Sequence, residues 1–234
     1  RAVPVPKEAA GELSAALLKL ARRQDIPPGT RVEALAVVPG GLNSIDPELF
    51  DFLRAQLHPD TAVTIRSAAA DVISRAKLTT GQLESLTQSL TAASPLDVDR
   101  LLTPFGQCSS DSVGMQLVAA LKESAALSAL RPDALKTHLA KFGPPVQKEA
   151  QQLFATLNVD LAKQQQHLEE LLASMSSTEI VTPDIRRGQA VFMSQKAACS
   201  SCHQYGYLGG KIGPDLTRIG GIRTERDLLE SIAF

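Results

Sequence analysis

Two cysteines and one histidine are the residues of this chain whose types and spacing have the clearest chemical use. Cys199 and Cys202 are separated by two serines, and His203 follows directly. This pattern is typical of covalent attachment of a c-type haem. Each thiol adds across one vinyl group of the porphyrin, the two intervening residues match the span between the vinyls, and the imidazole then lies under the iron as its proximal ligand. The spacing therefore predicts an attached haem c whose iron is bound by His203.

The residues that flank this motif predict the elements that hold it in place. A short helix is expected to begin near Thr182 and to include Phe192. After the motif, residues 205–211 are expected to form a glycine-rich loop and residues 212–217 a rigid turn. A second helix is expected to follow, with Thr224 as its N-cap.

The order of these elements resembles a class I cytochrome c. In that family a Gly-Pro-x-Leu segment follows the attachment site, as Gly213, Pro214, Asp215 and Leu216 do here. The resemblance implies that the Pro214 carbonyl accepts the Nδ1 proton of His203 and that Leu216 packs on the haem. Such a hydrogen bond would fix the tautomer of His203 and raise its basicity as a ligand.

The helix before the motif extends the resemblance. Gly188 and Phe192 have the i, i+4 spacing of the glycine and phenylalanine that pack where the family's terminal helices cross. As a set, the motifs of residues 183–234 are similar to the haem-binding domain of large multidomain proteins from planctomycetes and verrucomicrobia. There the domain often follows a sugar-dehydrogenase-like β-propeller and helical repeats. The resemblance implies a periplasmic or otherwise exported module that exchanges electrons with a redox partner protein or an upstream dehydrogenase domain.

The sixth ligand of the iron is the point at which the chain departs from the family. The family's distal methionine lies after the attachment site, whereas the methionines of this chain all precede it. They are Met115, Met175 and Met193. Tyr205 and Tyr207 follow His203 so closely that the opposite face of the haem is difficult for them to reach. Lys211 could bind iron only when deprotonated, which an exposed lysine resists at neutral pH. We therefore expect the distal methionine and the closing helix to lie beyond Phe234.

Three other interpretations of the cysteines stay open at this point. A structural zinc site needs four ligands, but Cys199, Cys202 and His203 cluster without a fourth, and Cys108 is far away along the chain. A thioredoxin-like redox pair needs a βαβ context, which the sequence does not show. A short pattern can also arise by chance in a helical protein. Cys108 itself is expected to be a buried small apolar residue.

Charge and hydropathy exclude several classes of partner. The formal net charge is −1, which gives no electrostatic basis for binding nucleic acid or an anionic membrane. No apolar run approaches the ~20 residues that a transmembrane helix needs. Because the chain begins with Arg1 and ends within a helical pattern at Phe234, we expect it to be a piece of a longer protein.

Residues 1–175 are predicted to form one domain of helical repeats. Helical periodicity runs through most of this stretch, with Leu17 among the expected buried positions, and Pro and Gly clusters mark the breaks. Similar segments recur at Arg31, Arg66, Arg100 and Asp133, with offsets of 35, 34 and 33 residues. Helix pairs of this period predict a HEAT-like α-solenoid, with an irregular helical bundle as the alternative. The expected fold class is therefore all-α, with this solenoid followed by a cytochrome c haem domain.

Two functions of different classes follow from these observations. The first is electron transfer through the haem. The second is a scaffold whose helical surface binds a partner protein, with a haem that is accessory or senses a ligand. A haem enzyme would need distal acid–base groups, and the sequence near the motif shows none. His58, His138 and His167 are isolated from one another and are expected to be surface or hydrogen-bonded structural residues.

The missing sixth ligand predicts the spectrum of the 234-residue chain when it carries haem. The ferric iron should be high-spin or mixed-spin, and the ferrous iron should bind carbon monoxide, because no strong distal ligand competes. Electronic and resonance Raman spectra measure this. A clean low-spin histidine–methionine spectrum would contradict the prediction, since one of the three methionines would then have to reach the iron.

Overall fold

The chain is mostly helical. The computed structural model describes residues 7–176 and 184–233, and in this part of the chain it contains twelve α-helices and one two-stranded sheet. The all-α fold class is therefore confirmed. The described helices include none that is both long enough and apolar enough to span a membrane.

The chain divides into two compact units, which are described separately. One unit comprises Arg1–Leu157 and the other Asn158–Phe234. This division falls within a long helix, whereas the sequence suggests a boundary between residues 175 and 183. Most of that expected linker lies outside the described residues, so the domain limits 1–175 and 183–234 stay a prediction.

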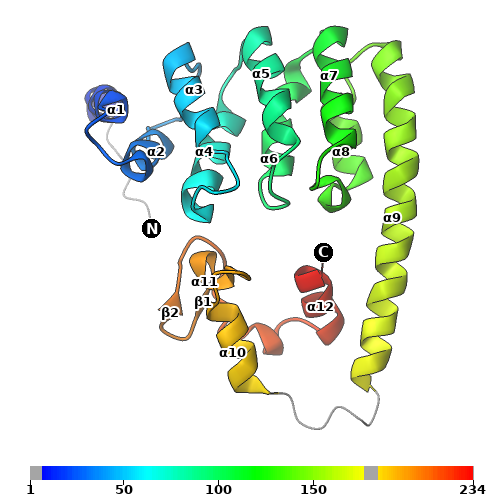
Figure 1. The fold of residues 1–234 in the computed structure, drawn as a ribbon. Coiled ribbons are helices and arrows are strands. Elements are labelled where there is room, and N and C mark those ends of the chain that lie inside the picture. Colours follow the sequence, from blue (N-terminus) through cyan, green and yellow to red (C-terminus); the bar gives the residue numbers. More distant parts are fainter. Residues whose placement is uncertain (1–6, 177–183, 234) are drawn as a thin grey trace. The chain divides into compact units, whose positions relative to one another are not determined.

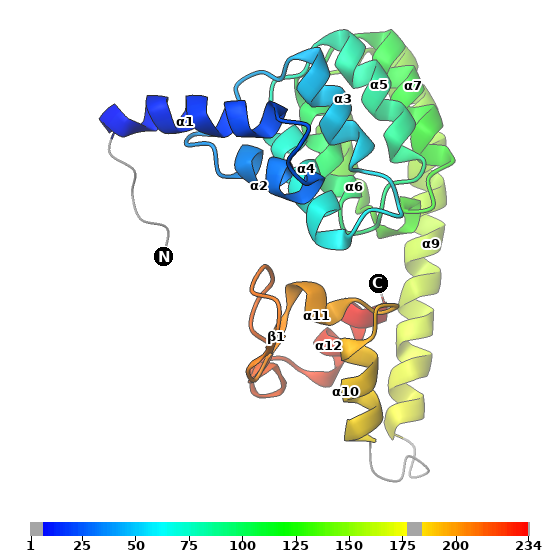
Figure 2. The ribbon, with the colours of Figure 1, turned by 60° about the vertical axis from the view of Figure 1, so that its left-hand side comes forward.

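Helices in the first unit pack in two rows (Figure 1, Figure 2). Their bounds are α1 Lys7–Arg22, α2 Pro28–Ala36, α3 Pro47–Ala55, α4 Val63–Arg75, α5 Thr80–Leu90, α6 Val98–Leu102, α7 Asp111–Lys122 and α8 Pro132–Leu139, with 3₁₀ turns at Thr103–Gln107 and Leu127–Ala129. In one row α2 contacts α4, α4 contacts α6 and α6 contacts α8; in the other α3 contacts α5 and α5 contacts α7. Helix α9, Pro144–Ser176, follows them and continues past the division between the units.

The recurring sequence segments occupy equivalent places in this arrangement. Arg31 lies on α2, Arg66 on α4, Arg100 on α6 and Asp133 on α8. These four helices form one of the two rows, and each contacts the next. The offsets read from the sequence therefore match the spacing of successive helix pairs. The assignment of these pairs to the HEAT-like type remains a prediction.

Aliphatic side chains fill the space between the rows. Phe105, Leu53, Leu86 and Leu117 are among the fully buried residues of one continuous apolar cluster that runs from α1 into α9. Burial of this apolar surface is the main force that holds the unit together. One expectation is corrected here: Leu17 is only half-buried and packs at the edge of the cluster, because α1 is the end helix and has a neighbour on one side.

Two helices begin at breaks expected from proline and glycine: α2 at Pro28 and α9 at Pro144. Pro47 and Pro132 also stand at the start of their helices, where a missing backbone N–H costs nothing. Asp46 caps α3 by accepting the Leu49 N–H at 3.0 Å.

A buried ion pair joins helix α4 to Asp97, the residue directly before α6 in the same row. The Arg66 Nε donates to Asp97 Oδ2 at 3.1 Å, and the Ser67 hydroxyl donates to the other carboxylate oxygen at 2.6 Å. The side chain of Asp97 is 1% exposed and that of Arg66 is 11% exposed. A second guanidinium nitrogen of Arg66 donates to the Pro59 carbonyl at 3.1 Å. Removal of either charged partner would leave the other without compensation in the interior.

Two polar side chains make further buried links between successive helix pairs. The Gln82 amide donates to the Ile45 carbonyl at 2.8 Å, and the same residue completes a capping box with Thr79 at the start of α5. The Ser124 hydroxyl donates to the Leu90 carbonyl at 2.8 Å. Both bonds join residues more than thirty positions apart, so they fix how adjacent pairs stack.

Small elements make up the second unit beyond α9. They are α10 Ile185–Met193, α11 Cys199–Cys202, β1 Gln204–Tyr205, β2 Leu208–Gly209, a 3₁₀ turn at Ile219–Gly221 and α12 Glu225–Ala233. The two strands are antiparallel, with Gln204 paired to Gly209 and Tyr205 to Leu208. Leu168, on α9, is the one buried residue among those described in this unit. Backbone hydrogen bonds rather than a packed core therefore organise it.

Replacement of Asp97 by Ala should destabilise the first unit by about 3–5 kcal/mol, because it leaves the Arg66 guanidinium buried without its carboxylate. Urea denaturation followed by circular dichroism measures the change. Asp71→Ala is the matched control, since Asp71 pairs with Arg75 on the same helix α4 but both side chains are nearly half exposed. That variant should lose less than about 1 kcal/mol. Equal losses in the two variants would show that the buried pair contributes no more than the exposed one.

Candidate functional site

The two cysteines lie at the ends of a single helical turn. Cys199 and Cys202 bound α11, and the His203 N–H donates to the Cys199 carbonyl at 2.9 Å, so the histidine leaves the turn in an extended conformation. Both cysteines are free thiols and are half-buried. Ala198, just before the turn, has φ of 53°, the left-handed region that alanine rarely adopts. Backbone strain of this kind is found where a site must be held in one geometry.

Pro214 fixes the orientation of the His203 ring. The Nδ1 of His203 lies 2.9 Å from the Pro214 carbonyl oxygen, and because a carbonyl can only accept, Nδ1 carries the proton. In the neutral ring the lone pair is then on Nε2, which is the atom available to a metal. The hydrogen bond that the resemblance implies is therefore present in the structure.

Glycine is required at two places around this ring. An ideal Cβ on Gly213 would lie 2.7 Å from two atoms of the His203 imidazole. Gly209 has φ of +103°, and a Cβ there would collide with the His203 carbonyl oxygen. The loop after the motif can thus pass close to the histidine only because these side chains are absent.

Backbone hydrogen bonds attach the same loop to the cysteine turn. The Gly213 N–H donates to the Cys202 carbonyl at 2.7 Å, and the Gly210 N–H donates to the Ser200 carbonyl at 2.8 Å. The Leu216 N–H donates to the Gln204 carbonyl at 2.8 Å. The loop, the turn and the hairpin therefore form one connected backbone unit around His203.

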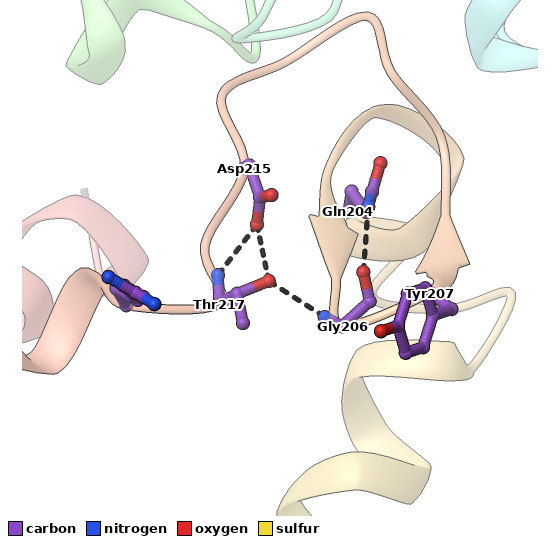
Figure 3. Close-up of a pocket in the computed structure, with 6 residues that line it drawn as sticks. Gln204, Gly206, Tyr207, Asp215 and Thr217 are labelled. Carbon is purple, nitrogen blue, oxygen red and sulfur yellow. Dashed lines mark hydrogen bonds between the residues drawn. The ribbon is translucent and has the colours of Figure 1, made fainter.

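A depression of about 550 Å³ opens beside this loop (Figure 3). Asp215 Oδ1 accepts the Thr217 N–H at 2.8 Å and the Thr217 hydroxyl at 2.5 Å, and that hydroxyl in turn accepts the Gly206 N–H at 2.8 Å. The two hydrogen bonds from Thr217 lower the pKa of Asp215, so its carboxylate stays ionised and the network stays intact well below neutral pH. Tyr207, at the hairpin tip, is fully exposed.

Many apolar side chains around the motif face solvent. Among them are Ile185, Val191, Met193, Tyr205, Leu208, Ile212, Ile222 and Ile232. Leu216, which the resemblance places on the haem, is half-buried. This exposed apolar surface is available to an apolar group or a partner protein.

Helix α10 packs against the cysteine turn and the hairpin. An ideal Cβ on Gly188 would meet nothing within 4 Å among the described residues, and the helix crossing expected there stays a prediction, because its partner helix is expected beyond Phe234. The neighbours of α10 are α11 and the hairpin: the Phe192 ring lies 6.4 Å from that of Tyr205, tilted by 59°. The expected helix start near Thr182 lies outside the described residues, and Asp184 caps the described helix by accepting the Arg187 N–H.

Helix α12 begins as expected. The Asp227 N–H donates to the Thr224 hydroxyl and the Thr224 N–H donates to the Asp227 carboxylate, both at 3.1 Å, which is a reciprocal capping arrangement. Arg226 forms an ion pair with Glu169 of α9 at 2.6 Å.

The other candidate ligands lie elsewhere. His58 faces Asp60, and His138 faces Asp99 at 3.7 Å, as expected for structural histidines. Of the described residues, no three His, Cys, Asp or Glu side chains are grouped closely enough to hold a metal ion. A haem iron does not need three grouped protein ligands, since the porphyrin supplies most of its ligands.

The chain was compared with protein-family models, curated proteins and solved structures. None of them matches it. The assignment of a function therefore depends on the geometry of the site.

That geometry fits a c-type haem. The thiols of Cys199 and Cys202 flank one helical turn, His203 holds its proton on Nδ1 and leaves Nε2 for the iron, and Gly213 leaves room beside the ring. The exposed apolar side chains around the turn are of the kind that contact a porphyrin.

Sequence reasoning missed the link from Thr217 to Gly206, although an Asp two residues before a Thr is a recognisable turn signal.

Gly213→Ala should reduce the haem attached per chain, because the added methyl displaces the His203 ring from the Pro214 carbonyl. The ratio of haem absorbance to protein, measured after expression in a host with c-type maturation machinery, tests this. Gly188→Ala is the matched control, because its methyl meets nothing within 4 Å and should leave the haem content unchanged. Full haem content in Gly213→Ala would contradict the proposed position of the ring.

Proposed function

We propose that this chain carries a covalently attached haem c on Cys199 and Cys202, with His203 as the proximal iron ligand, and that it transfers electrons as a module of a larger exported redox protein. The observation that carries the proposal is the 2.9 Å hydrogen bond from His203 Nδ1 to the Pro214 carbonyl directly after the two-cysteine turn. Bound haem supplies a one-electron couple between ferric and ferrous iron.

Residues of this chain hold and tune the group. The Pro214 carbonyl keeps the proton on Nδ1, which orients the ring and increases electron donation from Nε2. Leu216 and the exposed apolar residues of α10 and the hairpin would cover the porphyrin and exclude water, which changes the reduction potential through burial. The free cysteine thiols provide the two covalent bonds.

The helical unit is proposed to be a HEAT-like α-solenoid over residues 1–175, followed by the haem domain over residues 183–234. Its two rows of helices and the placement of Arg31, Arg66 and Arg100 in one row support this. The solenoid would hold the haem module beside a redox partner protein or an upstream dehydrogenase domain. A periplasmic or otherwise exported location is part of this proposal, because haem c is attached outside the cytoplasm in bacteria.

A scaffold for protein–protein interaction is the second candidate. It is favoured by the buried core of the first unit, which is complete without any contribution from the cysteine motif. In that case a partner would bind equally well to the chain with and without its haem. An electron-transfer module predicts instead that a reductant or oxidant protein exchanges electrons only with the haem-loaded form.

Covalent attachment through Cys199 and Cys202 is tested with cysteine variants expressed in a host that matures c-type cytochromes. After acid–acetone extraction, the wild-type chain and Cys108→Ser should stay red, because Cys108 lies in the other unit. The double variant Cys199→Ser/Cys202→Ser should lose its haem on extraction. Extractable haem in the wild-type chain, or stoichiometric zinc in place of haem, would overturn the proposal.

A further inference from the structure

The hydrogen bond between His203 and Pro214 depends on the direction of one carbonyl group. That carbonyl belongs to the peptide unit between Pro214 and Asp215, so its direction is set by ψ of Pro214 and φ of Asp215. The ring of proline fixes its own φ but not its ψ. A restraint on Asp215 is therefore needed to keep the carbonyl aimed at the imidazole.

Thr217 supplies that restraint. Asp215 Oδ1 accepts both the backbone N–H and the hydroxyl of Thr217, at 2.8 and 2.5 Å, which closes a tight turn over residues 215–217. The Thr217 Oγ1 also accepts the Gly206 N–H at 2.8 Å, from the turn of the hairpin (Figure 3). One hydroxyl thus acts as donor and acceptor, and its loss would break both contacts together.

The far ends of this network are attached to the motif itself. On one side of Pro214, the Gly213 N–H is bound to the Cys202 carbonyl; on the other, the Leu216 N–H is bound to the carbonyl of Gln204, the residue after the histidine. The carbonyl of Pro214 therefore lies between two residues whose backbone N–H groups are hydrogen-bonded to the motif region. Thr217 ties the Asp215 side of that loop to the hairpin.

We infer that Thr217, acting with Asp215, is a positioning residue that holds the Pro214 carbonyl against His203 Nδ1 and so sets the strength of His203 as an iron ligand. The effect on the strength of His203 as an iron ligand rests on the proposed function, because it requires the haem. The position of the Pro214 carbonyl concerns residues of this chain alone. Because the Thr217 side chain is exposed, a change that removes only its hydroxyl costs little packing.

The test compares Thr217→Val, which lacks the hydroxyl, with Thr217→Ser, which keeps it. In the haem-loaded chain, the iron–histidine stretching frequency of the five-coordinate ferrous form reports the strength of the Nδ1 hydrogen bond. Thr217→Val should lower this frequency and raise the reduction potential, because a less tightly hydrogen-bonded imidazole donates less charge to ferric iron. Thr217→Ser should match the wild-type chain. Equal behaviour of wild type and Thr217→Val, or of Thr217→Ser and Thr217→Val, would overturn the inference.

A second measurement separates this inference from the proposed function. In the haem-free chain labelled with ¹⁵N-histidine, the wild-type His203 should show the Nδ1–H tautomer, and Thr217→Val should show a mixture of tautomers. Asp215→Asn keeps one acceptor oxygen and the fold of the loop, so it should give a smaller shift in the same direction. No shift in either variant would overturn the positioning role, whereas a wild-type chain that acquires no haem would overturn the proposed function alone.

Discussion

The carbonyl of Pro214 accepts a hydrogen bond from the imidazole of His203, and the rest of the small unit is arranged around that contact. None of the described residues in 184–233 is buried, so the segment does not fold around an apolar core. Its turn, hairpin and loop are held together by backbone hydrogen bonds that converge on the cysteine turn. A polypeptide of this kind is suited to surround a large apolar group, which then supplies the interior that the side chains do not.

The helical unit is stabilised in a different way. Its buried Leu, Ala and Val side chains form one continuous cluster, and buried polar links such as the pair of Arg66 with Asp97 fix how successive helices stack. The hydrophobic effect supplies most of its stability, and the polar links add specificity at a desolvation cost. Changes at the cysteine motif should therefore leave this unit folded, so attachment and stability can be studied separately.

Helix positions and repeat spacing could be predicted from the sequence because periodicity, proline and glycine act locally. The four related segments lie on α2, α4, α6 and α8, as their offsets require. The half-buried state of Leu17 could not be predicted, because burial depends on whether a helix has neighbours on both sides. The ion pair of Arg66 and Asp97 joins residues thirty-one positions apart, and periodicity carries no information about such partners.

The candidate site also combines features that could be predicted from the sequence with features that could not. The resemblance to a class I cytochrome c, carried by the cysteine motif and the Gly-Pro-x-Leu segment, implied the hydrogen bond between His203 and Pro214, which is present. The left-handed conformation of Ala198 is specified by no short motif, and the Asp-x-Thr turn signal does not identify Gly206 as the partner of Thr217. The helix crossing expected at Gly188 stays a prediction, because its partner helix is expected beyond Phe234.

Mass spectrometry of a tryptic digest tests the central claim most directly. Trypsin should release residues 197–211 as one peptide, since Lys196 and Lys211 bound it, and the peptide contains both cysteines of the motif. For a chain matured in a competent host, this peptide should carry the added mass of one haem, while the peptide that contains Cys108 stays unmodified. An unmodified or merely disulfide-linked peptide 197–211 from such a host would contradict covalent haem attachment.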